Sequence, residues 1–234
     1  MIRVALVLGV AVLAALAVSV GPLYAADRFR DLREPTDAER AQITALAEPG
    51  GLDVDRIAIE SADETEGISD DASGRRGSAT GPAEVAVRGP PRRRVLFLTE
   101  DVLTDLDEDV AVGLLAAEAG RTATYYAEFR AVAVGAVLAM LAAVVTALVP
   151  FESGFGAVVA VGLVSFWAGR RVQYAADSRA ADAVGADRVA DAFERVAERR
   201  GVEPETGDWS TWFEVQPPLG DRIERLRDRA ADEE

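Results

Sequence analysis

Glu118 and Arg121 are the pair in this sequence whose residue types and spacing are best suited to chemistry. A glutamate can accept a proton from water, and an arginine three residues later lies within ion-pairing reach on the same helix face. The 234 residues include no histidine and no cysteine, so the commonest general base, the commonest metal ligand and every thiolate are missing. All 25 basic residues are arginine, which leaves no lysine to activate a serine. A lone carboxylate cannot stabilise a tetrahedral oxyanion, so the pair predicts a structural contact more readily than catalysis.

The chain is strongly acidic, with a formal net charge of −15. Such a charge repels nucleic acid, and we exclude nucleic acid as a partner. Two interpretations of the acidity remain open. One is a solvated surface of a halophilic protein, adapted to very high salt, and the other is an acidic docking face for a basic partner.

An uncharged segment at the beginning of the chain predicts a membrane anchor. Residues 4–20 read VALVLGVAVLAALAVSV, and with the extension to residue 26 they can cross a hydrocarbon core of about 30 Å. We therefore predict an N-terminal transmembrane anchor over residues 1–26. A cleaved signal peptide is the alternative, because Arg3 precedes the apolar run and residues 23–25 could form a cleavage site.

Two further apolar runs predict a transmembrane helical hairpin over residues 131–169. The runs, residues 131–149 and 155–169, are separated by a short break that contains Pro150 and the sole charge, Glu152. A hairpin buried in a soluble core is the alternative, since the second run is short.

The positions of the arginines predict the orientation of this hairpin. Arg130 flanks one end and Arg170 and Arg171 flank the other, whereas the turn has no basic residue. The positive-inside rule then places both flanks in the cytoplasm and the turn outside. We expect a multi-pass protein of the cell membrane whose soluble domain is cytoplasmic. The arginines that follow the first apolar segment agree with this orientation.

The remaining residues form two pieces, 27–130 and 170–234, which can pack into one domain because the hairpin returns the chain to the same side. Thr36 and Glu39 predict a capping box that starts a helix ending near residue 46. Alternating patterns predict a strand over residues 53–60 and a β-hairpin of residues 84–88 and 94–98. We expect a flexible loop over residues 61–83 and a second loop over 206–215.

Helices account for the other soluble segments. Thr99 is expected to cap a helix over residues 100–106, and acidic residues at 107–109 suit the start of a longer helix that runs to about Arg130. Residues 171–200 have helical periodicity with a break near Gly185, and residues 221–231 predict a short charged helix.

Four segments in order resemble a known family. They are EVAVRG with RVLFLTEDVL (84–89 and 94–103), LDEDVAVGLLAAEAGR (106–121), QYAADSRAA (173–181) and QPPLGDRIERL (216–226). Together they resemble the HtpX-like and CAAX prenyl protease family of membrane zinc metallopeptidases, peptidase family M forty-eight, in which a transmembrane hairpin commonly separates the second and third motifs. The resemblance covers about residues 27–234. It implies an α+β fold, a mostly helical gluzincin-like metallopeptidase domain with a small β-sheet, attached to the anchor and the hairpin.

The resemblance also shows what this sequence lacks. The family's H-E-x-x-H motif places two zinc ligands and a general base on one helix face, and a third ligand comes from another helix. Here Ala117 and Arg121 stand at the two histidine positions and Gln173 stands at the third ligand position. Alanine has no donor atom, arginine is a permanent cation and glutamine is a weak ligand. We therefore expect no zinc and no other cofactor.

The other motif positions complete the candidate site. Glu118 keeps the residue type of the general base, as a vestigial position, and Asp177 keeps the family's aspartate. Gln216 stands at the later histidine position, and Arg222 belongs to the same motif. We predict that Arg121 replaces the metal structurally, by bonding both Glu118 and the amide oxygen of Gln173.

Three functions follow as hypotheses. The first is an inactive pseudopeptidase with a regulatory or peptide-binding role, which acts through an edge strand expected near residues 94–98. Its partners would be the membrane together with a membrane protein or peptide, or a related active peptidase. The second is an active metalloendopeptidase in membrane protein quality control, working through an unrecognised site. The third is a membrane structural protein unrelated to peptidases, for which the helices bearing Glu118 and Gln173 need not pack together.

Overall fold

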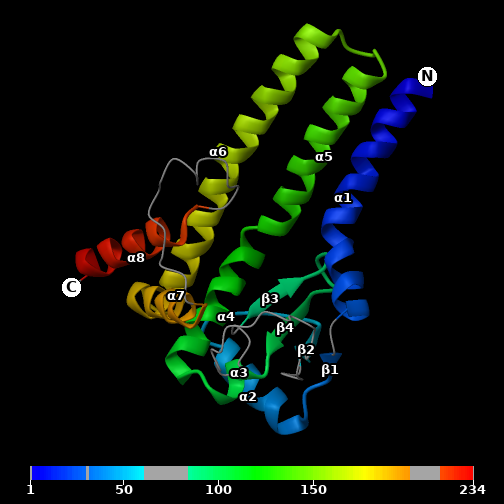
Figure 1. The fold of residues 1–234 in the computed structure, drawn as a ribbon. Helices are drawn as coiled ribbons and strands as arrows, with labels where there is room; N and C mark the ends of the chain where they lie inside the picture. The colour runs from blue at the N-terminus through cyan, green and yellow to red at the C-terminus, as the bar shows by residue number, and fades with distance from the viewer. Residues whose placement is uncertain (1, 30–31, 61–83, 201–216, 234) are drawn as a thin grey trace, which may run out of the picture.

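The structure is a computed structural model that describes residues 2–29, 32–60, 84–200 and 217–233. Three long helices extend side by side from a compact part built of a small sheet and shorter helices (Figure 1). The loops expected over residues 61–83 and 206–215, and the candidate residue Gln216, lie outside the described residues.

The three long helices are α1 (Ile2–Phe29), α5 (Tyr126–Val145) and α6 (Phe151–Val184), and each is long and apolar enough to cross a membrane. α5 packs against both α1 and α6. Large apolar side chains point outward along all three helices, among them Leu13, Val132 and Leu163, whose exposed fractions are 64% or more. Since no apolar partner covers these side chains within the described part of the chain, a hydrocarbon environment is their physical complement. The chain is a membrane protein.

The hairpin turn lies earlier in the sequence than predicted. α5 ends at Val145, Ala147 has a positive φ of 51°, and Pro150 immediately precedes α6. Glu152, Ser153 and Gly154 were expected in the turn but belong to the first turn of α6. Proline at the start of a helix needs no backbone partner for its nitrogen, and an acidic residue next to it suits the positive end of the helix dipole.

A four-stranded mixed sheet has the order β1-β2-β4-β3. Its strands are β1 (Leu32–Arg33), β2 (Arg56–Glu60), β3 (Val85–Arg88) and β4 (Val95–Thr99). β3 and β4 form the predicted antiparallel hairpin, with Val87 opposite Leu96, and β2 pairs with β4 in parallel. The prediction that residues 94–98 form the edge strand is wrong, because β2 and β3 cover both sides of β4. Among the strands that the structure describes, β3 is the last one on this side of the sheet, so the edge belongs to β3.

Alternation along β2 and β4 gives the sheet two different faces. Ile57 and Ile59 of β2, with Leu96 and Leu98 of β4, join the core formed with α2 (Asp37–Ala47) and α4 (Glu108–Ala123). Ala58 and Phe97 point to the opposite face, where they meet Leu32 and Val95. The period of two in the sequence therefore positions the sheet against α4, as expected for a half-buried strand.

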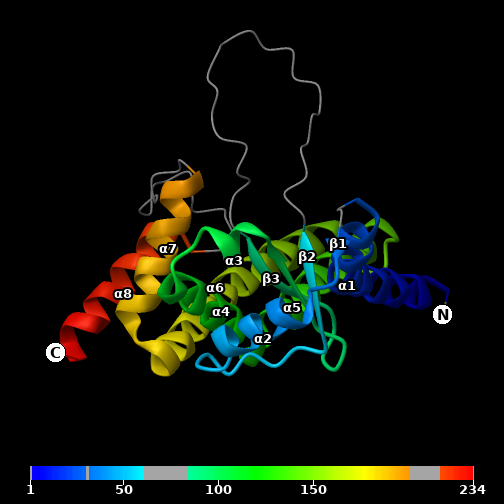
Figure 2. The same ribbon diagram turned by 90° about the horizontal axis from the view of Figure 1, so that it is seen from below.

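α4 is the central helix of the soluble part, and every residue from Val110 to Gly120 is buried. The sheet and α2 lie on one side of it, while α7 (Ala186–Arg200) and α8 (Leu219–Glu233) lie toward the other, as Figure 2 shows. The predicted helix to Arg130 is interrupted at Tyr125, which has a left-handed backbone with φ 53°. The hydroxyl of Thr124 bonds the carbonyl oxygens of Gly120 and Arg121, which competes with continuation of the helix. α5 therefore starts in a new direction at Tyr126.

The short helix α3 (Asp101–Thr104) also differs from its prediction. Thr99 does not cap it, because the Thr99 hydroxyl accepts a hydrogen bond from the Glu84 amide at 3.1 Å. Thr99 is the last residue of β4, and the neighbouring strand reaches its side chain before the helix does.

α6 runs without a break from the membrane-spanning part into the soluble part. It passes through residue 170, where we place a domain division from the sequence, and ends at Val184. Gly185 follows with φ 93°, a conformation that glycine adopts without strain, and separates α6 from α7 as predicted. The residues that α6 carries into the soluble part thus lie on the same continuous helix as its apolar segment.

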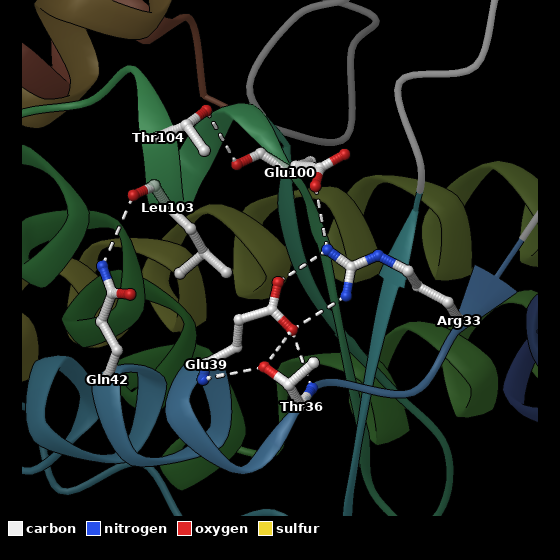
Figure 3. Close-up of polar contacts among 7 residues, drawn as sticks. All are labelled: Arg33, Thr36, Glu39, Gln42, Glu100, Leu103 and Thr104. Carbon is white, nitrogen blue, oxygen red and sulfur yellow. Dashed lines mark hydrogen bonds and ion pairs between the residues drawn. The ribbon is translucent and has the colours of Figure 1, made fainter.

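A polar network fastens the chain where it leaves the membrane anchor. The predicted capping box is present: Thr36 accepts from the Glu39 amide, and Glu39 accepts from the Thr36 amide. Arg33 of β1 donates to both carboxylate oxygens of Glu39, at 2.9 and 2.7 Å, and to Glu100 at 3.0 Å (Figure 3). These contacts tie β1 to the beginning of α2 and to the segment before α3.

Candidate functional site

The candidate site lies where α4 approaches α6. A Cβ atom added at Gly120 would lie 2.2 Å from the carbonyl oxygen of Ala176, so only glycine permits this approach of the two helices. The close contact brings Glu118 and Arg121 of α4 near Gln173 and Asp177 of α6. The structure thus gathers four of the predicted site residues, and Arg222 of α8 joins them through Asp177.

Glu118 is buried, with 6% of its surface exposed, and both of its carboxylate oxygens have partners. Oε1 accepts a hydrogen bond from Nη1 of Arg121, and Oε2 accepts one from the backbone amide of Val87 at 3.2 Å. Val87 belongs to β3, so Glu118 connects the central helix to the free edge of the sheet. Each carboxylate oxygen of Glu118 is therefore engaged in a hydrogen bond within the protein.

Arg121 makes one of the two contacts predicted for it, the one with Glu118, and does not make the one with Gln173. Its guanidinium contacts Glu118, but Gln173 is not among its hydrogen-bond partners, and Arg121 Nε is buried without a partner among the described residues. The attraction to Glu118 raises the pKa of Arg121 above its ordinary value against the opposing effect of burial, and Asp177 contributes in the same direction. Arg121 therefore remains a cation beside Glu118.

Gln173 does not make the predicted bond to Arg121, because its amide group is oriented along its own helix toward Asp177. Nε2 donates to Asp177 one turn later at 3.2 Å, while Oε1 is buried without a partner in the described part of the chain. Asp177 accepts two bonds from Arg222, at 2.8 and 2.7 Å, and the Arg222 guanidinium lies 4.3 Å from the centroid of the Phe193 ring. Asp177 and Arg222 thus hold α8 on α6 and α7, and Gln173 extends this network.

The residues at the family's ligand positions do not fit a zinc ion. Ala117 is 3% exposed and packs in the apolar cluster that contains Ala180 and Ala181. Arg121 repels a divalent cation, and Gln173 offers one neutral amide oxygen. Among the residues that the structure describes, no three His, Cys, Asp or Glu side chains gather as a metal site. We therefore derive no chemical step through a metal here.

A cavity of about 450 Å³ opens beside this pair, between the edge of β3, the end of α4, the beginning of α5 and the α1 helix. Glu118, Arg121 and Val87 line it, together with Arg88, Arg94 and Arg130. Arg94 donates to the carbonyl oxygen of Thr122 at 3.1 Å and pairs with Glu128 at 3.5 Å, which fixes the break between α4 and α5. Among the charged residues of this lining, the four arginines outnumber the two glutamates, Glu118 and Glu128, although the whole chain is acidic.

Two functional features of this site were missed in the sequence. The first is the Val87 amide, which no side-chain pattern can reveal because its contact with Glu118 depends on the position of β3. The second is Tyr126, whose ring is buried and whose hydroxyl is buried without a partner among the described residues. A signal was available for the second, since Tyr126 belongs to the polar sequence TATYY, which precedes the apolar run of α5.

The overall fold is similar to that of a solved structure, Ste24p of S. mikatae. The TM-score is 0.66 and the sequence identity is 15%, over 97% of this chain and 58% of Ste24p. At this identity the likeness establishes a shared fold and fits a distant relationship, and the chain spans a little over half of the length of Ste24p. No family model matches the sequence. A search of curated proteins also gives no match.

Proposed function

We propose that this chain is a membrane-anchored, peptidase-like protein that does not hydrolyse peptides with zinc and that binds an extended peptide segment at the free edge of β3. The observation that carries the proposal is the engagement of Glu118, whose two oxygens are taken by Arg121 and by the Val87 amide. The shared fold with Ste24p and the order of the motifs support a peptidase-like origin, and the packing of α4 on α6 speaks against chance motif matches.

The peptide-binding role rests on the hydrogen-bonding pattern of β3. The Thr99 amide donates to the Glu84 carbonyl oxygen, so alternate residues of β3 bond β4, and Val85 and Val87 present their backbone groups to the other side. Glu118 satisfies the Val87 amide, and Val87 itself lines the 450 Å³ cavity. An extended segment can add to such an edge through backbone hydrogen bonds.

Metal analysis tests the first half of the proposal. We expect the purified protein to contain no stoichiometric zinc by elemental analysis, and one zinc per chain would overturn the proposal. The variant A117H/R121H/Q173E restores three ligands on helices that already approach within contact distance, so it should bind one zinc. Its matched control is R121H/Q173E, which retains Ala117, lacks one ligand and should bind zinc far more weakly.

Binding of β-casein, an unfolded protein that offers extended segments, tests the second half. We expect the parent to bind β-casein without cleaving it, and Val85→Pro to weaken binding at least tenfold because proline removes an edge amide. Val85→Ala keeps that amide and should bind as the parent does. Equal binding by Val85→Pro and Val85→Ala would show that the edge of β3 is not the binding site.

The proposed orientation is cytoplasmic for the soluble part, in line with the arginines at the hairpin ends. It can be tested with single cysteines, since the chain has no native one. A membrane-impermeant thiol reagent should label Glu152→Cys in intact cells and should not label Asp53→Cys. Both positions are exposed, so the reverse result would contradict the orientation.

A further inference from the structure

A second cavity, separate from the β3 edge, lies between the membrane-spanning parts of α5 and α6. Its volume is about 660 Å³. One face of α5 lines it at helical spacing, from Tyr126 through Arg130 and Val134 to Leu138, and α6 contributes Gly162 and Phe166. A Cβ atom added at Gly162 would meet no heavy atom within 4 Å, so the groove is open at this point. We refer to it below as the α5–α6 groove.

The groove is apolar along most of its length and cationic at one end. Arg130 lies at the border of the charge-free part of α5, and its side chain makes no hydrogen bond or ion pair with the residues that the structure describes. The other arginines at this level differ: Arg170 pairs with Asp221 at 3.4 Å, and Arg171 lies over the Trp167 ring at 5.3 Å. An unpaired guanidinium at the membrane boundary is suited to a phosphate group.

A second polar group points to the same ligand. Tyr126 is 7% exposed, its hydroxyl is buried without a partner among the described residues, and its side chain lines both the α5–α6 groove and the 450 Å³ cavity. A buried hydroxyl without a partner is unfavourable, and a hydrogen-bond acceptor at this junction would relieve that cost. Arg130 also lines both cavities. The two residues lie one helical turn apart on α5, at the junction of the two cavities.

We propose that the α5–α6 groove is a binding site for one phospholipid molecule, with an acyl chain in the groove and the phosphate at Arg130 and Tyr126. The distance along α5 from Arg130 to Leu138 is about 12 Å at a rise of 1.5 Å per residue. This length is comparable to half of a hydrocarbon core of about 30 Å, which is the depth that one acyl chain occupies.

A peptide fits this groove less well than a lipid does. The backbone groups of α5 and α6 are bonded within their own helices, so the groove offers no row of donors and acceptors to an extended chain. Its lining is apolar apart from Ser165, Arg130 and the Tyr126 hydroxyl. These properties suit one hydrocarbon chain with one anionic group.

The test uses the full chain, stripped of lipid in detergent and titrated with phosphatidylglycerol, with retained lipid counted by native mass spectrometry. We expect one tightly retained molecule per chain. Arg130→Gln should weaken retention at least tenfold, and Tyr126→Phe should weaken it severalfold. Arg171→Gln is the matched control, because it removes an arginine at the same level outside the groove, and it should retain lipid as the parent does. Equal losses in Arg130→Gln and Arg171→Gln would overturn the proposal.

A glycine pair tests the position of the acyl chain. Gly162→Leu fills the groove, whereas Gly156→Leu adds the same side chain to α6 outside it, and neither added Cβ meets a neighbouring atom. We expect Gly162→Leu to abolish retention and Gly156→Leu to preserve it, and retention by both variants would rule out the groove. Displacement of the lipid by equimolar glycerol 3-phosphate would show that the site recognises a free phosphate, and displacement by β-casein would show that it belongs to the peptide. Either result would overturn the proposal.

Discussion

Two carboxylate–arginine pairs lie within the same group of helices, and they differ in almost every physical respect. Asp177 and Arg222 are 45 residues apart, both side chains are 6% exposed, and two hydrogen bonds join them. Glu118 and Arg121 lie three residues apart on α4, and the Arg121 side chain is 27% exposed where it reaches the cavity. The first pair joins separate helices, whereas the second lies within one helix.

The difference separates a contact that maintains the fold from one that occupies a site. Asp177 and Arg222 are desolvated and fully engaged, with Phe193 under the guanidinium and Gln173 on the carboxylate. Arg121 leaves its Nε unpaired and faces a cavity. Loss of a partner should therefore strand a buried charge in the first pair, while water can reach the second through the cavity.

The largest effect is expected for Arg222→Ala. It leaves the Asp177 carboxylate buried without its cation, at a cost of about 3–5 kcal/mol in the free energy of unfolding. Unfolding measured in mixed detergent micelles would give this difference. The double variant Asp177→Leu/Arg222→Met removes both charges and should cost less than the single one. A loss below about 1 kcal/mol for Arg222→Ala would contradict this prediction, because it would mean that the pair contributes no more to stability than an exposed ion pair does.

An intermediate effect is expected for Arg121→Ala. Glu118 keeps its bond to the Val87 amide, so the variant loses one charged hydrogen bond, worth about 1–3 kcal/mol. Combination with Glu118→Gln in a double-mutant cycle should show that the two residues are coupled. An Arg121→Ala variant as stable as the parent would contradict the idea that this arginine has a structural role beside Glu118.

The smallest effect is expected at the surface pair of Arg33 and Glu39. Bonds to Arg33 and to Thr36 lower the pKa of Glu39 from 4.5 to about 2. The ionised carboxylate thus adds stability that is fully present above pH 4.5 and is lost as the pH falls toward 2. Glu39→Gln should flatten the dependence of stability on pH in this window, by less than the effect of Arg121→Ala at neutral pH.

Glu48→Gln is the control for the surface pair. Glu48 follows the same helix and is exposed, and its side chain has no hydrogen bond or ion pair within the described ranges. Its variant should keep the slope of the parent. An equal change of slope in both variants would contradict the prediction, because the effect would then come from net charge and not from the Arg33–Glu39 pair.

Sequence reasoning identified the elements whose causes are local. The apolar runs of α1, α5 and α6 are continuous over lengths that cross a membrane, and the Thr36–Glu39 box is complete within four residues. Gly185 ended a helix where predicted, since its positive φ is a property of the residue and its immediate neighbours. The break at Tyr125 was missed because its cause, the bonds from the Thr124 hydroxyl to carbonyl oxygens of α4, is not visible in the residue pattern.

The absence of histidine and cysteine, the residue types at positions 117, 121 and 173 and the lengths of the apolar runs follow from the sequence alone, because they depend on composition and short-range order. The tertiary structure decided which contacts those residues make. It made β3 the free edge, directed Gln173 to Asp177 and gave Glu118 a partner in the Val87 amide. A hydrogen bond depends on the distance and direction between two atoms, and segments far apart in the chain acquire these when the helices and the sheet pack together.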